Sequence, residues 1–410
     1  MTTTNDTSTL DSINLGSLDF WAEADIHAAL ATLRREAPVT WHEHPDSGKG
    51  FWSVTRHADI AQINGEMTLF SNREGIRINH DKGMGLVRPG TDSIIEMDPP
   101  QHTVMRKIVA RGFTPRSVGR FEGLIRQRSR SIIQGVASRG SCDFVADLAV
   151  LLPLHIICDI VGVPEEDREY VFDLTNRSLG ENDPALSQGP EYGSAAAAEL
   201  KAYGRDLGVR RIADPKDDLV TDLMNADVSG RALTPDELGG FFSLLIAAGN
   251  ETTRNALSFG MHGFSEFPEQ RDLFVRHHEF GPSAAEEIVR WASPLMHMRR
   301  TLTADTTFRG ADMKKGDKVV LWYISSNRDE EIFEDPHRFD ITRSPNLHQA
   351  FGGGGAHFCL GSNLAKLEII VFFQELFAML PDIHTVEEPV RLRSSQFRGV
   401  SRLNVEFTPR

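Results

Sequence analysis

The sequence predicts a mainly α-helical fold with a small β region. Apolar side chains recur at helical spacing through most of residues 100–295. Strand-like runs of β-branched and aromatic residues are confined to two short regions, residues 50–64 and 300–325. The chain of 410 residues shows no internal repeat and no low-complexity linker, and its length allows one large domain or two or three ordinary ones.

The N-terminal segment is expected to be a loose arm over residues 1–20, followed by a folded domain over residues 21–410. The first ten residues are polar and rich in threonine, without the basic and apolar stretches of a targeting sequence. The first strand is expected at Phe51–Thr55, and two later strands at residues 306–309 and 318–323, separated by a Gly-Asp turn.

One helix is expected to be unusually long, from about Thr234 to Phe267. Its start is marked by a capping box between Thr234 and Glu237, with a proline at the first helical position. Residues 241–248 are apolar nearly all round the helix, so it should run through the interior of the protein.

Composition restricts the partners and the compartment. The formal net charge of -14 argues against nucleic acid and anionic membrane surfaces as partners. The 3 cysteines, Cys142, Cys158 and Cys359, stand at unrelated spacings, which fits a reducing cytoplasm and no disulfide framework. The most apolar internal run, residues 148–163, is interrupted by proline and polar residues and predicts a buried helix, so no membrane anchor is expected.

The environment of Cys359 is the most informative feature of the chain. A run of four glycines, residues 352–355, precedes it, and a long apolar helix over about residues 362–380 follows it. A helix N-terminus stabilises a thiolate, and glycines allow a tight loop that can lie flat against a planar ligand. No second cysteine lies nearby, which excludes zinc and iron–sulfur frameworks. A single thiolate under a flat cofactor indicates haem iron; the alternative is a glycine-rich turn with a buried free cysteine.

This loop resembles the haem-binding signature of the cytochromes P450, the haem-thiolate monooxygenases. The resemblance extends from about Leu30 to the C-terminus, with the segments in the same order. It implies the single-domain cytochrome P450 fold, haem b as cofactor and Cys359 as iron ligand. The common signature has Phe seven residues before the cysteine, whereas Phe351 stands eight before it, with one extra glycine. This longer form is similar to that of a bacterial group that hydroxylates sterols and methyl-branched lipids.

A second motif lies inside the long helix, at residues 247–253. Small residues followed by an acid and a hydroxyl are unfavourable in mid-helix, both for propensity and for burial. Thr252 can bond back to the carbonyl of Ala248 and bend the helix, which would open a groove for a diatomic ligand. The resemblance implies that Thr252 hydrogen-bonds dioxygen, that Glu251 supplies protons, and that Ala248 and Gly249 contact the haem. The alternative is a packed glycine kink with a solvated glutamate.

Cationic groups are expected to hold the haem propionates. His102 and Arg106 stand at i and i+4 and share a helix face, a spacing that in isolation is more often a solvated face. The residues that match the haem contacts of the family by position are His102, Arg106, Arg300, Gly352, His357 and Gly361.

Glu287 and Arg290 form the family's Glu-x-x-Arg pair. Their spacing of three residues makes a buried ion pair available on one helix face. We interpret the pair as structural and expect Arg338 or His337 to be its third partner. The pair would fix the register of the haem loop.

The expected substrate contacts come from the loop over about residues 76–87, from the long helix, and from two later segments. They are mostly apolar, and methionines accommodate varied shapes. The residues are Ile76, Ile78, Met84, Leu86, Val87, Leu244, Ala247, Leu295, Met296, Met298 and Phe397. Such a pocket favours a steroid, a terpenoid or a methyl-branched lipid, hydroxylated at a chain terminus; alternatively, several of these side chains only fill core.

The resemblance implies a monooxygenase that inserts one atom of dioxygen into a C–H bond of a small apolar substrate. Its electrons would come from a ferredoxin and a ferredoxin reductase, and an acidic ferredoxin would be attracted by basic side chains near Cys359. These are Lys107, Arg111, Arg343 and Lys366. Two alternatives stay open: a haem-thiolate peroxygenase that uses hydrogen peroxide, whose known members replace the Glu251–Thr252 pair, and a non-enzymatic haem sensor.

Overall fold

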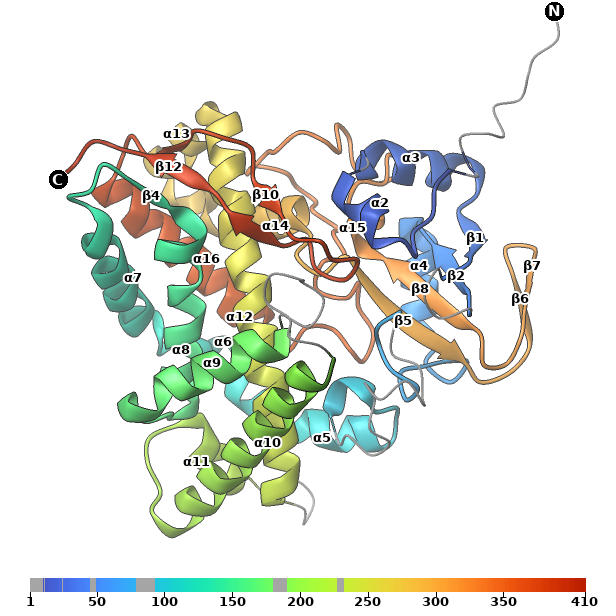
Figure 1. Ribbon diagram of the computed structural model, residues 1–410, viewed down its shortest axis with the longest axis horizontal. Coiled ribbons are helices and arrows are strands. Elements are labelled where there is room, and N and C mark those ends of the chain that lie inside the picture. The colour runs from blue at the N-terminus through green and yellow to red at the C-terminus, as the bar shows by residue number, and fades with distance from the viewer. Residues whose placement is uncertain are drawn as a thin grey trace, which may run out of the picture.

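The helices and the sheets of the protein occupy different regions. The computed structural model describes residues 10, 12–23, 25–44, 49–78, 93–179, 190–226 and 232–410. Helices fill one side of the molecule, and the largest sheet lies on the other side with the N-terminal helices (Figure 1). The predicted mainly α-helical fold with a small β region is therefore confirmed. Among the described residues, no helix is both long enough and apolar enough to cross a membrane.

The larger helices share one core. They are α7 (Glu122–Val136), α8 (Leu151–Val161), α9 (Arg168–Leu179), α10 (Pro190–Ala213), α12 (Pro235–Glu266), α14 (Gly281–Ala292) and α16 (Ser362–Met379). The shorter helices are α2 (Leu18–Glu23), α3 (Ile26–Glu36), α4 (His57–Gly65), α5 (Gln101–Val109), α6 (Pro115–Gly119), α11 (Leu219–Met224), α13 (Pro268–Arg276) and α15 (Tyr323–Ser326).

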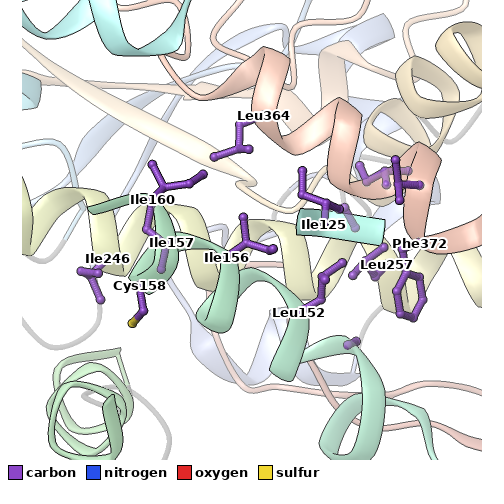
Figure 2. Close-up of a cluster of buried hydrophobic side chains, with 14 of the residues drawn as sticks. Ile125, Leu152, Ile156, Ile157, Cys158, Ile160, Ile246, Leu257, Leu364 and Phe372 are labelled. Atoms are coloured by element: carbon purple, nitrogen blue, oxygen red, sulfur yellow. The ribbon is translucent and has the colours of Figure 1, made fainter. Parts of the chain in front are cut away.

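The long helix α12 runs through the middle of the helical region, as predicted (Figure 1). Its capping box is formed: the Glu237 backbone N–H donates to Thr234 Oγ1 at 3.2 Å, and the Thr234 N–H donates to Glu237 Oε2 at 3.0 Å. Helix α10 packs so closely on α12 that a Cβ on Gly239 would lie 2.4 Å from the Lys201 carbonyl oxygen, and the absence of a side chain at Gly239 permits this approach. Figure 2 shows part of the core, where side chains of α7, α8 and α16 pack around Ile246 and Leu257 of α12.

The largest sheet has five strands in the order β1-β2-β8-β5-β3. Their bounds are β1 (Val39–His42), β2 (Phe51–Val54), β8 (Lys318–Trp322), β5 (His297–Leu302) and β3 (Phe70–Ser71). Strand β8 pairs parallel with β2 and antiparallel with β5. The smaller sheets contain β4 (Ser141–Asp143), β6 (Thr306–Phe308), β7 (Ala311–Met313), β9 (His384–Thr385), β10 (Val390–Arg391), β11 (Val400–Arg402) and β12 (Asn404–Glu406).

The strand expected at Phe51–Thr55 is present as β2, and α4 follows it within residues 50–64, because Ile60 and Ile63 bury one helical face. One local expectation was wrong. The loose arm expected over residues 1–20 is shorter than predicted, since Leu15 is fully buried and α2 already begins at Leu18. Residues 1–9 lie outside the described part of the chain.

The predicted Glu287–Arg290 pair is present and fully buried. Arg290 Nε lies 2.7 Å from Glu287 Oε2, and neither side chain is exposed. The third ionic partner is Arg343, at 3.3 Å from Glu287, and neither Arg338 nor His337 as expected. Arg338 is exposed and accepts a hydrogen bond from Arg290 through its carbonyl oxygen. The pair thus attaches α14 to the chain that leads to the Cys359 loop, and breaking it would leave a buried charge uncompensated.

Candidate functional site

A cavity lies between α12 and the loop that precedes α16. Its volume is about 240 Å³, and α5, α8 and β5 complete its walls. It brings together most of the predicted site residues. Those that line it are His102, Arg106, Leu244, Ala248, Gly249, Thr252, Leu295, Met298, Arg300, Gly352, His357, Cys359 and Gly361.

Cys359 stands at the floor of this cavity, one turn before α16. The glycines at 352–355 have φ angles of 98, 62, 92 and 75°, a left-handed run that residues with a Cβ adopt only rarely. The Cys359 backbone N–H donates to the carbonyl of Phe351 at 2.8 Å, which closes the loop. Phe351 lines the cavity in spite of the extra glycine between it and Cys359.

The thiol of Cys359 is not held as a thiolate by the protein alone. Removal of the sulfur from water raises the pKa of Cys359, and this outweighs the backbone N–H groups of Gly361 and Ser362 and the charge of Arg106, which lower it. The helix N-terminus therefore acts as expected but is not sufficient. A cation bound at the sulfur would supply the missing stabilisation, as a metal ion does for a coordinating thiol.

The predicted propionate contacts differ in how well they fit a carboxylate. Arg300 on β5 is buried and permanently charged, and it lines the cavity. Both ring nitrogens of His102 are buried without a hydrogen-bond partner among the described residues, a cost that a haem carboxylate would relieve. Burial lowers the pKa of His102, so its ring is a neutral donor at neutral pH.

His357 and Arg106 are partly engaged elsewhere. The ring of His357 lies 4.1 Å from that of His102, and its Nε2 donates to the Met97 carbonyl at 3.1 Å. Burial and the neighbouring charges lower the pKa of His357 to about 3, so its second nitrogen could donate to a carboxylate only after protonation. Arg106 donates to the carbonyl of Phe358 at 2.5 Å and thereby holds the Cys359 loop.

The opposite wall is the α12 segment with the predicted oxygen-binding motif. Thr252 Oγ1 donates to the Ala248 carbonyl at 2.7 Å, as the sequence predicts. Glu251 does not line the cavity: it is buried, and its carboxylate accepts from Arg254 at 2.5 Å and from Asn255 at 2.9 Å. Successive helical residues are about 100° apart, so a cavity-facing Thr252 turns Glu251 away.

The substrate expectations divide into three groups. Leu244, Leu295 and Met298 line the cavity. The other described candidates, which do not line it, are Ile76, Ile78, Ala247, Met296 and Phe397. Of these, Ile78 and Met296 belong to a core cluster with Trp322. Met84, Leu86 and Val87 lie outside the described residues.

Several cavity residues escaped the sequence reasoning. Phe241, Leu245 and Val289 add to the apolar wall, and Glu368 of α16 adds an isolated acid. One carboxylate oxygen of Glu368 is buried without a partner in the described structure, and burial raises its pKa to about 8. An acid set between apolar neighbours, Leu367 and Ile369, within the apolar run of residues 362–380 is the signal that could have identified it.

Comparisons with known proteins agree with this site. A family model described as "Cytochrome P450" matches residues 282–380. The chain is 44% identical over 407 residues to the methyl-branched lipid omega-hydroxylase of Mycobacterium tuberculosis, covering 97% of this chain and 95% of the relative. It is 40% identical over 397 residues to the steroid C26-monooxygenase of Rhodococcus jostii, covering 95% and 83%. The solved structure of a Mycobacterium marinum cytochrome P450 in complex with pseudoionone superposes with a TM-score of 0.88 at 36% identity, covering 97% and 99%.

Substitution of Cys359 tests the iron ligand. We expect Cys359→Ala to abolish the carbon monoxide difference band of thiolate-ligated haem, because no other described thiol faces the cavity. Cys158→Ala, which removes a fully buried thiol on α8, is the matched control and should keep the band. A normal band in Cys359→Ala would refute the ligand assignment.

Replacement of Glu368 tests its buried carboxyl group through pH. Because the folded-state pKa is raised from the ordinary 4.5 to about 8, the wild-type protein loses stability as the pH rises through this window. Glu368→Gln removes this loss of stability. The unfolding free energy of the variant minus that of the wild type should therefore be larger at about pH 8 than at about pH 5, by about 1 kcal/mol or more.

Glu375→Gln on the same helix is the matched control for this experiment. Burial raises the pKa of Glu375, but hydrogen bonds from Arg130 and Arg126 outweigh it, so the pKa is lowered. Its stabilisation is present above the unfolded pKa and is lost as the pH falls, so Glu375→Gln should destabilise at neutral pH. Equal effects of Glu368→Gln at both pH values, in chemical denaturation, would contradict the assignment.

Proposed function

We propose that this protein hydroxylates a methyl-branched lipid, a steroid or a terpenoid at a chain terminus. The chain belongs to the cytochrome P450 family and is a monooxygenase of that family. The observation that carries the proposal is the apolar wall of the cavity beside Thr252, formed by Phe241, Leu244, Leu295 and Met298. Burial of apolar surface is the main source of affinity that such a wall offers. The relatives, which act on methyl-branched lipids at the omega position and on steroids at C26, support the same substrate class.

The family carries a haem-thiolate cofactor, and we propose that it is haem b. Cys359 would ligate the iron, and Arg300 and His102 would receive the carboxylates of the porphyrin. Bound haem would supply the binding and reductive activation of dioxygen and the insertion of one oxygen atom into a C–H bond.

The residues of the chain orient the substrate and deliver protons. Thr252 has its hydroxyl hydrogen on the Ala248 carbonyl, so its oxygen can accept a hydrogen bond from a water or from another proton donor in the cavity. Glu251 would supply protons after leaving its ion pair with Arg254 and rotating toward solvent or the groove. The ion pair thus holds Glu251 away from the cavity between proton transfers.

A ferredoxin, itself reduced by a ferredoxin reductase, is the proposed electron donor. The expected basic patch is smaller than the sequence suggests, because Arg343 is bound to Glu287 and Lys366 to Glu286 at 2.9 Å. Lys107 and Arg111 stay exposed on and after α5, close to Arg106, which contacts the Cys359 loop. These two charges would steer an acidic partner to the cysteine side of the haem. The described cysteines are free thiols, which supports a cytoplasmic location.

A substrate panel tests the proposed class. We expect methyl-branched fatty acids or steroids to shift the haem spin state at concentrations about tenfold or more below those of small charged aromatic compounds, and to yield terminal alcohols. Leu244→Ala should weaken this binding by about 3- to 30-fold, the scale for lost apolar contacts in a pocket. Leu347→Ala, at a position 57% exposed, is the control and should bind as the wild type does. A response to polar aromatics alone would reject the class.

Thr252→Ala separates dioxygen activation from substrate binding. Because Thr252 lies in the groove and outside the apolar wall, the substrate-induced spin shift should persist while electrons go to hydrogen peroxide instead of product. We expect product per electron pair to fall about tenfold or more, the scale of a lost proton-transfer contribution. Thr252→Ser keeps the hydroxyl and should restore coupling. Full coupling in Thr252→Ala, with peroxide alone driving wild-type turnover as fast as reductant and dioxygen, would favour the peroxygenase alternative.

A further inference from the structure

Asn64, in the last turn of α4, joins two parts of the site that are far apart in the sequence. Its Nδ2 donates to the Gly352 carbonyl at 2.9 Å, and its Oδ1 accepts from Arg300 Nη2 at 2.9 Å. Asn64 is 4% exposed, so both bonds are made away from bulk water. An amide offers a donor and an acceptor on one rigid group, which neither a carboxylate nor an apolar side chain can reproduce.

The glycine loop is fitted closely to Asn64. A Cβ on Gly355 would lie 2.5 Å from the Asn64 carbonyl oxygen, and a Cβ on Gly353 would lie 3.1 Å from its Nδ2. Both glycines also have left-handed φ angles. The loop that leads to Cys359 therefore packs directly on the backbone and the side chain of this one residue.

Asn64 provides one of the two hydrogen bonds that orient the Arg300 guanidinium. Its Nη1 donates to the carbonyl of Arg299 at 3.1 Å and its Nη2 to Asn64, and in the described part of the chain no carboxylate pairs with it. Arg300 is 4% exposed, and a buried guanidinium without a counter-ion is costly. The hydrogen bond to Asn64 helps to fix the direction of the guanidinium. Because the Asn64 amide is neutral, the whole charge of Arg300 stays available to a carboxylate in the cavity.

We propose that Asn64 is a positioning residue, whose amide sets the guanidinium of Arg300 toward the haem carboxylates and at the same time fixes the loop that carries Cys359. The proposal rests on the haem site of the proposed function. One side chain thereby keeps the iron ligand and the cation at the haem edge in a constant relation. Substitution of Asn64 should weaken haem binding through Arg300 and should change the electrostatic potential at the iron.

The experiment measures haem transfer to apomyoglobin and the midpoint potential of the ferric/ferrous couple. We expect Asn64→Ala to accelerate haem loss about tenfold in the wild-type background but only about threefold or less when combined with Arg300→Ala, because residues that act through one another are not additive. The isosteric Asn64→Asp keeps the shape of the side chain. It should neutralise Arg300, accelerate haem loss more than Asn64→Ala does, and make the potential more negative.

Gln62→Ala on the same helix is the matched control. The Gln62 side chain is exposed, and among the described residues it bonds only to Glu66, the residue that follows α4, at 2.9 Å, so haem loss and potential should be unchanged. Equal acceleration by Asn64→Ala with and without Arg300, or Asn64 variants that behave like Gln62→Ala, would overturn the proposal. If the wild-type protein itself lacks the thiolate-type carbon monoxide band, the haem site of the proposed function fails instead.

Discussion

The half-buried thiol of Cys359, one turn before α16, is the constraint on which the site depends. Desolvation raises the pKa of Cys359 even though the backbone N–H groups of Gly361 and Ser362 and the charge of Arg106 oppose this, and a cation bound at the sulfur would stabilise the thiolate. The loop before it consists of left-handed glycines. Arg106 on one side and Asn64 on the other bind carbonyl groups of this loop, which holds the sulfur against the cavity.

Helix α12 provides the other half of the site. It is long and buried, and it forms one wall of the cavity. The hydrogen bond from the Thr252 hydroxyl to the Ala248 carbonyl lies where small residues of α12 border the cavity. The helical period places Thr252 and Glu251 on different faces. The acid is therefore kept in an ion pair with Arg254, away from the cavity.

Buried charges connect the site to the scaffold, and each is compensated differently. Glu287 and Arg290 neutralise one another and anchor the chain between α15 and the loop. Arg300 is oriented by a neutral amide and keeps its charge for the cavity. Burial lowers the pKa values of His102 and His357, so the positive charge on this side of the cavity comes from arginine. Glu368 represents the opposite case, an acid kept protonated by burial.

The sequence by itself determined the features that depend on local spacing. These include the Cys359 loop, the capping box at Thr234, the Thr252–Ala248 bond and the Glu287–Arg290 pair, because each lies within a few residues along one element. Only the tertiary structure decided which apolar side chains face the cavity: Met298 does, whereas Met296 enters the core beside Trp322. It also decided that Arg343 is the third ionic partner and that Asn64 meets Arg300, 236 residues away. Contacts between distant segments depend on how whole elements pack, and neither periodicity nor motif spacing encodes that packing.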